Sequence, residues 1–163
     1  MSDTSYLDTM AVDKWLSANL SGFSGPVEAR KFADGQSNPT FALKAASGDY
    51  VLRRKPPGIL LKSAHAVDRE FRVQKALADT DVPVAKMHVF CEDEAVIGSI
   101  FYVMQMIDGV NYDNPSLPEL SFDERKPILH EMNRVLAGIH SVDIIKVGLS
   151  NFGPSGNYYQ RQT

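Results

Sequence analysis

The stretch YVLRRK, residues 50–55, decides how this 163-residue chain is interpreted. Side chains alternate between the two faces of a strand, so Leu52 and Arg54 point to one face. Val51 and Arg53 point to the other. A small apolar residue two positions before a cation suits a nucleotide site, in which Val51 covers a flat base and Arg53 reaches the phosphates. A surface strand that carries three solvated cations is the alternative, and this stretch alone does not separate the two.

One carboxylate on the helix that follows favours the nucleotide interpretation. Glu70 lies between Val67 and Phe71 on the inward stripe of a helix predicted over residues 64–78. The positions three and four residues away carry no cation, and burying an unpaired carboxylate costs several kcal/mol. Arg53 on the neighbouring strand is therefore the expected partner, in the ion pair that positions nucleotide phosphates in protein kinases. A solvent-facing Glu70 on a slightly rotated helix is the alternative.

The order of the predicted elements indicates an α+β fold built on an antiparallel sheet, not a parallel βαβ series. Ser63 is the expected N-cap of the second helix. A capping box at residues 121–124 opens the third, and Pro127 should kink that helix or delay its start. In chain order we expect a helix over 8–20, strands over 27–33, 40–46 and 50–55, a helix over 64–78, strands over 87–91 and 100–106, and a helix from 121.

Composition and charge exclude several classes of protein. With 44% hydrophobic and 23% charged residues, the chain is neither collagen-like nor disordered. Seventeen basic against 20 acidic residues give a net charge of −3, which offers no reason to expect nucleic acid or a membrane as partner. No signal peptide or membrane-spanning run is found, so we expect a cytoplasmic protein. The single cysteine, Cys91, is expected to be a buried strand residue.

Six motifs follow one another along most of the chain. They are GQSNPTF (35–41), YVLRRKPPG (50–58), DREFRVQKAL (68–77), VPVAK (82–86), FYVMQMIDG (101–109) and LAGIH (136–140). Each motif is weak by itself, but their order and spacing are specific. Together they resemble the aminoglycoside phosphotransferase family of small-molecule kinases, which has a protein-kinase-like fold. The most similar branch is that of the kinase-like domains of some acyl-CoA dehydrogenases.

The resemblance implies a kinase-like N-terminal lobe, in which a five-stranded antiparallel sheet packs against a helix, followed by a hinge and the first helix of the C-terminal lobe. It divides the chain into an N-terminal helix and linker (1–25), a nucleotide-binding lobe with its hinge (26–109) and the start of a helical lobe (110–163). An ordinary hairpin turn is the alternative for the loop at residues 34–38, and a plain buried strand is the alternative for residues 101–109. The candidate cofactor-binding residues are the phosphate-covering loop Gly35, Gln36, Ser37 and Asn38, the base cover Val51, the pair Arg53 and Glu70, the adenine-pocket residue Met104, and the hinge residues Gln105, Met106 and Ile107.

Three features depart from the family pattern. Arg53 stands where the family usually has lysine, and a bidentate guanidinium should give a different phosphate geometry. The loop at residues 35–38 lacks the multiple glycines of protein kinases. None of the four histidines is followed two residues later by aspartate, so the catalytic loop His-x-Asp-x-x-x-x-Asn is absent from this sequence. We therefore expect no catalytic residue and no metal ligand within these 163 residues. The chain is then the N-terminal portion of a longer protein.

The expected function is transfer of the γ-phosphoryl group of ATP to a hydroxyl group of a small molecule by the full-length protein. The implied cofactors are ATP and Mg²⁺, with the metal ligands beyond residue 163, and this portion alone should be inactive. A non-catalytic, pseudokinase-like nucleotide sensor or scaffold is the alternative, and an unrelated α+β domain without nucleotide is a third. The identity of the acceptor and the oligomeric state stay open.

Overall fold

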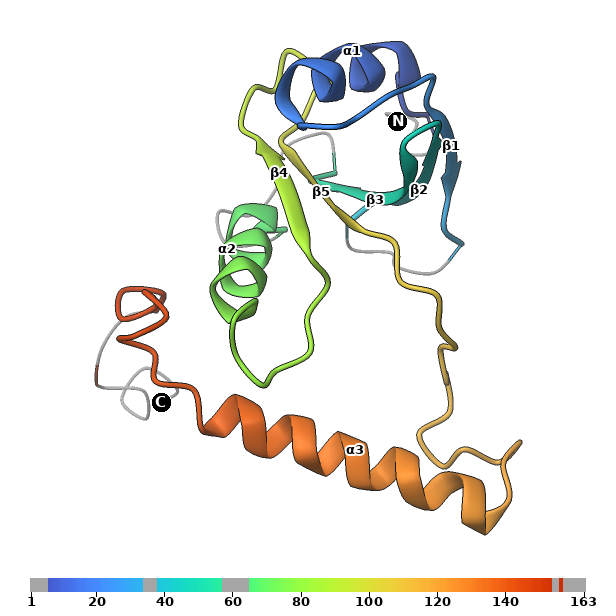
Figure 1. The fold of residues 1–163 in the computed structure, drawn as a ribbon, viewed down its shortest axis with the longest axis vertical. Coiled ribbons are helices and arrows are strands. Elements are labelled where there is room, and N and C mark those ends of the chain that lie inside the picture. The colour runs from blue at the N-terminus through green and yellow to red at the C-terminus, as the bar shows by residue number, and fades with distance from the viewer. Residues whose placement is uncertain (1–5, 34–37, 57–64, 154–155, 157–163) are drawn as a thin grey trace. The chain divides into compact units, whose positions relative to one another are not determined.

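The computed structural model describes residues 6–33, 38–56, 65–153 and 156 (Figure 1). Contacts between Cα atoms divide the chain into two units, one of residues 1–75 and 85–107 and the other of residues 76–84 and 108–163. The first unit contains the sheet and the candidate site. In chain order the elements are α1 (Thr9–Asn19), β1 (Glu28–Lys31), β2 (Thr40–Ala45), β3 (Gly48–Arg54), α2 (Val67–Leu77), β4 (Met87–Cys91), β5 (Phe101–Gln105) and α3 (Phe122–His140).

The sheet has five strands in the order β1-β2-β3-β5-β4, and every neighbouring pair is antiparallel. A two-residue loop joins β2 to β3, since Ala45 faces Gly48 in the register. Gly48 has a φ of 134°, a region that side-chain-bearing residues rarely adopt, so glycine is the residue suited to this turn. The predicted α+β class and five-stranded antiparallel sheet are confirmed.

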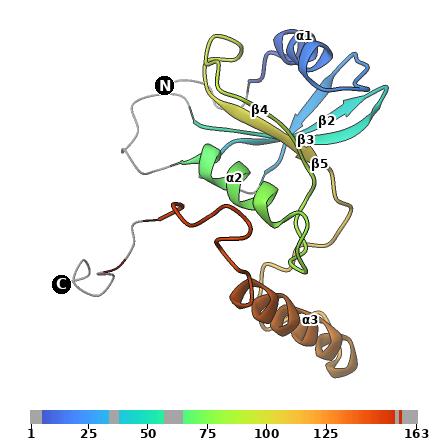
Figure 2. The same ribbon diagram turned by 60° about the vertical axis from the view of Figure 1, so that its left-hand side comes forward.

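Helix α1 covers one face of the sheet (Figure 2). It begins at the N-cap Asp8, whose side chain accepts a hydrogen bond from the Ala11 amide at 3.0 Å. Val12 and Leu16 are fully buried, and the core cluster joins them to strand residues such as Leu52. The ring of Trp15 packs edge-on against Phe101 with the ring centroids 5.1 Å apart. Because Leu52 belongs to this core, its neighbours Val51 and Arg53 point to the opposite face of the sheet.

Helix α2 lies against that opposite face. The ring of Phe71 stacks on Phe90 of β4 at 5.3 Å and contacts Tyr102 of β5 at 5.9 Å, measured between ring centroids. Because Phe71 anchors the helix, the neighbouring residue Glu70 is brought over the centre of the sheet. The sheet therefore has α1 on the face of Leu52 and α2 on the face of Arg53.

Some element boundaries differ from the sequence-based expectation. Helix α2 begins at Val67 rather than at residue 64, and Ser63 lies outside the described residues. Helix α3 begins directly after Ser121, whose capping box with Glu124 is present, so Pro127 does not delay its start. A proline inside a helix removes one backbone hydrogen bond. The reciprocal bonds of the cap hold the first turn in spite of that loss.

The remaining expectations concern Cys91 and membrane segments. Cys91 is buried at the end of β4, as predicted, and burial raises the pKa of its thiol. Across the described ranges, no helix combines the length and the apolar character that a membrane crossing requires.

Candidate functional site

The predicted ion pair between strand β3 and helix α2 is present. Arg53 Nε donates to Glu70 Oε2 at 2.7 Å, and Arg53 Nη2 lies 3.5 Å from Glu70 Oε1. Their side chains are 27% and 33% exposed, so neither group is fully solvated. The interpretation of Glu70 as a solvent-facing residue is therefore wrong. A strand of three solvated cations is wrong as well, because Arg54 is only 5% exposed and its guanidinium lies 5.7 Å from the ring centroid of Phe41.

The carboxylate of Glu70 accepts hydrogen bonds from two further side chains. Asn38 Nδ2 donates to Oε1 at 2.9 Å, and the hydroxyl of Tyr102 donates to Oε2 at 3.1 Å. Each carboxylate oxygen thus receives one bond from Arg53 and one from a neutral donor. Both neutral residues are almost completely buried, with Asn38 at 2% and Tyr102 at 1% exposure. Glu70 is the centre of a hydrogen-bond network, not only half of an ion pair.

Three more contacts extend this network. Arg53 Nη1 donates to Thr40 Oγ1 at 3.0 Å, and the Thr40 hydroxyl donates to the Asn38 carbonyl at 3.0 Å. His65 Nδ1 lies 2.9 Å from Asn38 Oδ1, within hydrogen-bond distance. Burial and the nearby charge of Glu70 raise the pKa of Tyr102, so its hydroxyl stays protonated and remains a donor.

Sequence reasoning missed Thr40, His65 and Tyr102. The register supplies the signal for two of them, because Arg53 faces Thr40 on β2 and Tyr102 on β5. Cross-strand partners share a face of the sheet. A correct pairing of the three strands would therefore have placed both hydroxyls beside the guanidinium.

The next row of side chains on this face is apolar. Ala42, Val51 and Met104 are cross-strand partners on β2, β3 and β5, two residues along from the row of Arg53. Val51 is buried and Ala42 is half-buried. Two predicted residues, Val51 and Met104, are thus adjacent, and the short side chain of Ala42 lies beside them.

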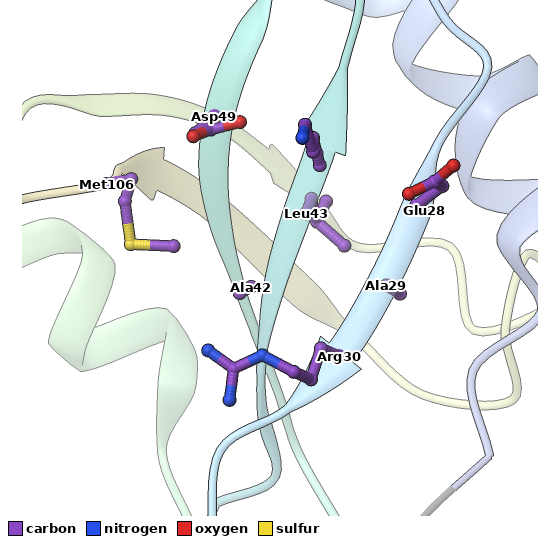
Figure 3. A pocket seen from close by; sticks show the side chains of 8 residues that line it. Glu28, Ala29, Arg30, Ala42, Leu43, Asp49 and Met106 are labelled. Carbon is purple, nitrogen blue, oxygen red and sulfur yellow. The ribbon is translucent and has the colours of Figure 1, made fainter.

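A pocket of about 370 Å³ opens where this row reaches β1 (Figure 3). Arg30, the register partner of Ala42, extends from β1 toward β2, and its guanidinium lies 5.7 Å from the ring centroid of Phe32. Of the predicted site residues, Met106 lines this pocket. The full lining is Glu28, Ala29, Arg30, Ala42, Leu43, Lys44, Asp49 and Met106.

The predicted hinge follows the end of β5. The backbone amide of Gln105 donates to the Lys86 carbonyl at 2.9 Å and is therefore engaged within the protein. Among the described residues, the amides of Met106 and Ile107 form no backbone hydrogen bond. Ile107 is 59% exposed. The predicted loop residues Gly35, Gln36 and Ser37 lie outside the described residues.

Comparison with known proteins identifies the family of the chain. Residues 28–163 match a protein-family model, that of the phosphotransferase enzyme family. The chain belongs to this family. It is similar to acyl-CoA dehydrogenase family member 10 of Mus musculus, with 47% identity over 93% of this chain, and to acyl-CoA dehydrogenase family member 11 of Homo sapiens, with 41% identity over 95% of this chain. The family assignment and both relatives confirm the resemblance drawn from the six motifs.

A solved structure of the same fold is that of a "putative aminoglycoside phosphotransferase" from Ralstonia eutropha JMP134. It is 47% identical to this phosphotransferase family member, and it superimposes with a TM-score of 0.83 over 96% of this chain. The fold and family are therefore those of a kinase-like phosphotransferase. The chain spans 45% of that structure, 14% of the mouse relative and 20% of the human one.

Proposed function

We propose that this chain is the ATP-binding part of a small-molecule kinase that transfers the γ-phosphoryl group to a hydroxyl of its acceptor. The observation that supports the proposal is the Arg53–Glu70 pair at 2.7 Å, on a sheet face that also carries the apolar row and the pocket. A cation beside an apolar platform matches the two ends of a nucleotide, the phosphates and the base.

Arg53 has donors left for an anion. A guanidinium carries five N–H groups, and within the described residues Nη1 and Nη2 each make a single bond, to Thr40 and to Glu70. The second N–H of each nitrogen is available to phosphate oxygens.

The base would lie on the row of Ala42, Val51 and Met104. The small side chain at Ala42 leaves space over the sheet, and the 370 Å³ pocket continues from it. Flat rings bind well on such apolar surfaces when a few polar groups fix their orientation. The amides of Met106 and Ile107, which form no backbone hydrogen bond to another described residue, are the groups we assign to the edge of the base.

Phosphoryl transfer also requires Mg²⁺, which neutralises the phosphate charge when bound. In the described ranges no cluster of three His, Cys, Asp or Glu residues would hold it. To the residues of this chain we assign the binding and orientation of the nucleotide.

The test uses the full-length protein. We expect Arg53→Ala to weaken binding of Mg·ATP about tenfold or more, because a charge-assisted hydrogen bond contributes about 1.5–3 kcal/mol. Adenosine, which lacks phosphates, should bind as tightly to Arg53→Ala as to the unmodified protein. Lys14→Ala, which removes an exposed cation from α1, is the control and should change neither affinity. Isothermal titration calorimetry measures both.

Equal ATP affinities for the unmodified protein and Arg53→Ala would refute the proposed site. Transfer of the γ-phosphoryl group is followed separately, with radiolabelled ATP and a panel of small hydroxyl compounds. Tight ATP binding without transfer to any acceptor would favour a nucleotide-binding module over a kinase.

A further inference from the structure

We propose that Tyr102 and Asn38 are positioning residues that act through Glu70 to hold Arg53 in its phosphate-binding orientation. The inference rests on the proposed function, and it adds two residues whose roles concern the ion pair rather than the nucleotide. Asn38 is thereby given a role other than contact with phosphate through its side chain.

Hydrogen bonds saturate the carboxylate of Glu70. A carboxylate offers about four lone-pair positions, and Glu70 receives bonds from Arg53 Nε, Arg53 Nη2, Asn38 and Tyr102. The two neutral donors approach different oxygens. They fix the plane of the carboxylate, and the carboxylate in turn fixes the plane of the guanidinium that pairs with it.

Tyr102 and Asn38 are more deeply buried than the ion pair that they contact. The side chains of Arg53 and Glu70 are about one-third exposed, at 27% and 33%, so water competes for their ion pair. Tyr102 and Asn38, at 1% and 2% exposure, are shielded from that competition. The buried donors therefore restrict a pair that would otherwise sample several rotamers.

The hydrogen bonds of Glu70 connect separate segments of the chain. Asn38 precedes β2, Arg53 lies on β3 and Tyr102 lies on β5, so three segments besides α2 meet at the carboxylate of Glu70. Asn38 also contacts His65, two residues before α2. The contacts of Asn38 thus join the end of the β1–β2 connection to the start of α2, and this coupling determines where Glu70 is held.

The side chain of Asn38 is buried and has a partner at each of its polar atoms. Its nitrogen is directed to Glu70 and its oxygen to His65, and only 2% of the residue is exposed. Both polar atoms are thus occupied inside the protein. An effect of Asn38 on phosphate binding would accordingly pass through Glu70.

The experiment compares single and double variants of the full-length protein. We expect Tyr102→Phe, which keeps the ring packed on Phe71, to weaken ADP binding about fivefold and to leave adenosine binding unchanged. Asn38→Ala should behave in the same way. In a Glu70→Ala background neither change should weaken ADP binding further, since both residues act through that carboxylate.

Tyr50→Phe is the matched control. It also removes a tyrosine hydroxyl from the sheet, but that hydroxyl bonds Ser47 at 3.0 Å and lies outside the Glu70 network. It should leave ADP affinity unchanged. With an acceptor that the unmodified protein phosphorylates, Tyr102→Phe should raise KM for ATP more than it lowers kcat. A purely structural defect would instead lower the amount of active enzyme and leave KM unchanged.

The outcomes separate this inference from the proposed function. If Arg53→Ala weakens ADP binding while Tyr102→Phe and Asn38→Ala have no effect, the inference is wrong and the nucleotide site stands. An equal loss with and without Glu70 also overturns it, because the residues would then act independently. If Arg53→Ala itself leaves ADP affinity unchanged, the nucleotide site is wrong, and the inference is overturned with it.

Discussion

Replacing Glu70 by alanine tests the central feature of the site, because it removes the shared acceptor of three side chains. Arg53 would lose its ion-pair partner, and the buried donors of Asn38 and Tyr102 would lose their acceptor. A partly exposed ion pair contributes up to about 1 kcal/mol, and each buried donor left unsatisfied costs about 1–3 kcal/mol. We expect the free energy of local unfolding of α2 to fall by about 3 kcal/mol.

Hydrogen exchange of the α2 amides in the full-length protein measures this loss directly. A reduction of about 3 kcal/mol corresponds to about 150-fold faster exchange over Val67–Leu77, at about 1.36 kcal/mol per factor of ten. Glu70→Gln keeps one acceptor oxygen and loses the charge, so its exchange should accelerate only about fivefold. Asp68→Ala, an exposed acidic residue in the same first turn, should change exchange by less than about twofold.

The same variants are titrated with ADP and with adenosine. Glu70→Ala should weaken ADP binding about tenfold more than adenosine binding, because the carboxylate orients the phosphate-binding cation and does not touch the base. Exchange in Glu70→Ala that matches Asp68→Ala would refute the energetic reasoning. Equal loss of the two ligands would refute the assignment of Glu70 to the phosphate end.

Three further changes probe other parts of the structure. Ala42→Leu should fill the space beside Val51 and weaken the binding of ADP and of adenosine alike, at least tenfold, as measured by calorimetry. Selective loss of ADP binding would contradict the assignment of Ala42 to the base end of the site. Burial and Lys86 lower the pKa of His88, so the folded state binds its proton less readily than the unfolded state. Stability should therefore fall as pH drops below about 6.5, and melting temperatures of His88→Gln between pH 7.5 and 5.5 should show a smaller decline. Ser121→Ala removes the capping box of α3 and should cost about 1 kcal/mol, seen as about fivefold faster exchange in its first turn, with no effect on nucleotide binding.

Much of the sheet is predictable from local pattern. Turn-forming residues separate the short extended runs, and the alternation along β3 correctly places Leu52 and Arg53 on opposite faces of the sheet. The partner of Glu70 follows from elimination, because its own helix offers no cation within one turn. These inferences succeed because each depends on a few neighbouring residues and on the cost of an unpaired charge.

The rest of the network depends on tertiary pairing. From the sequence alone Tyr102 is predicted to be an ordinary residue of a buried strand. Only the register of β3 and β5 places it opposite Arg53. The sequence predicts Asn38 to be part of a polar turn, because no neighbouring residue in the sequence indicates that its amide is buried against Glu70. Likewise the pocket combines residues from β1, β2, β3 and the segment after β5, which no single motif contains.

The adjacent arginines at positions 53 and 54 illustrate what alternation does to neighbouring identical residues. Arg54, packed against Phe41 at 5% exposure, belongs to the interior, while Arg53 belongs to the candidate ligand face. In a mutational scan, substitutions at the first position should yield well-expressed protein with impaired ligand binding, and substitutions at the second should reduce the yield of folded protein. Substitutions at two adjacent arginine codons would thus have different phenotypes.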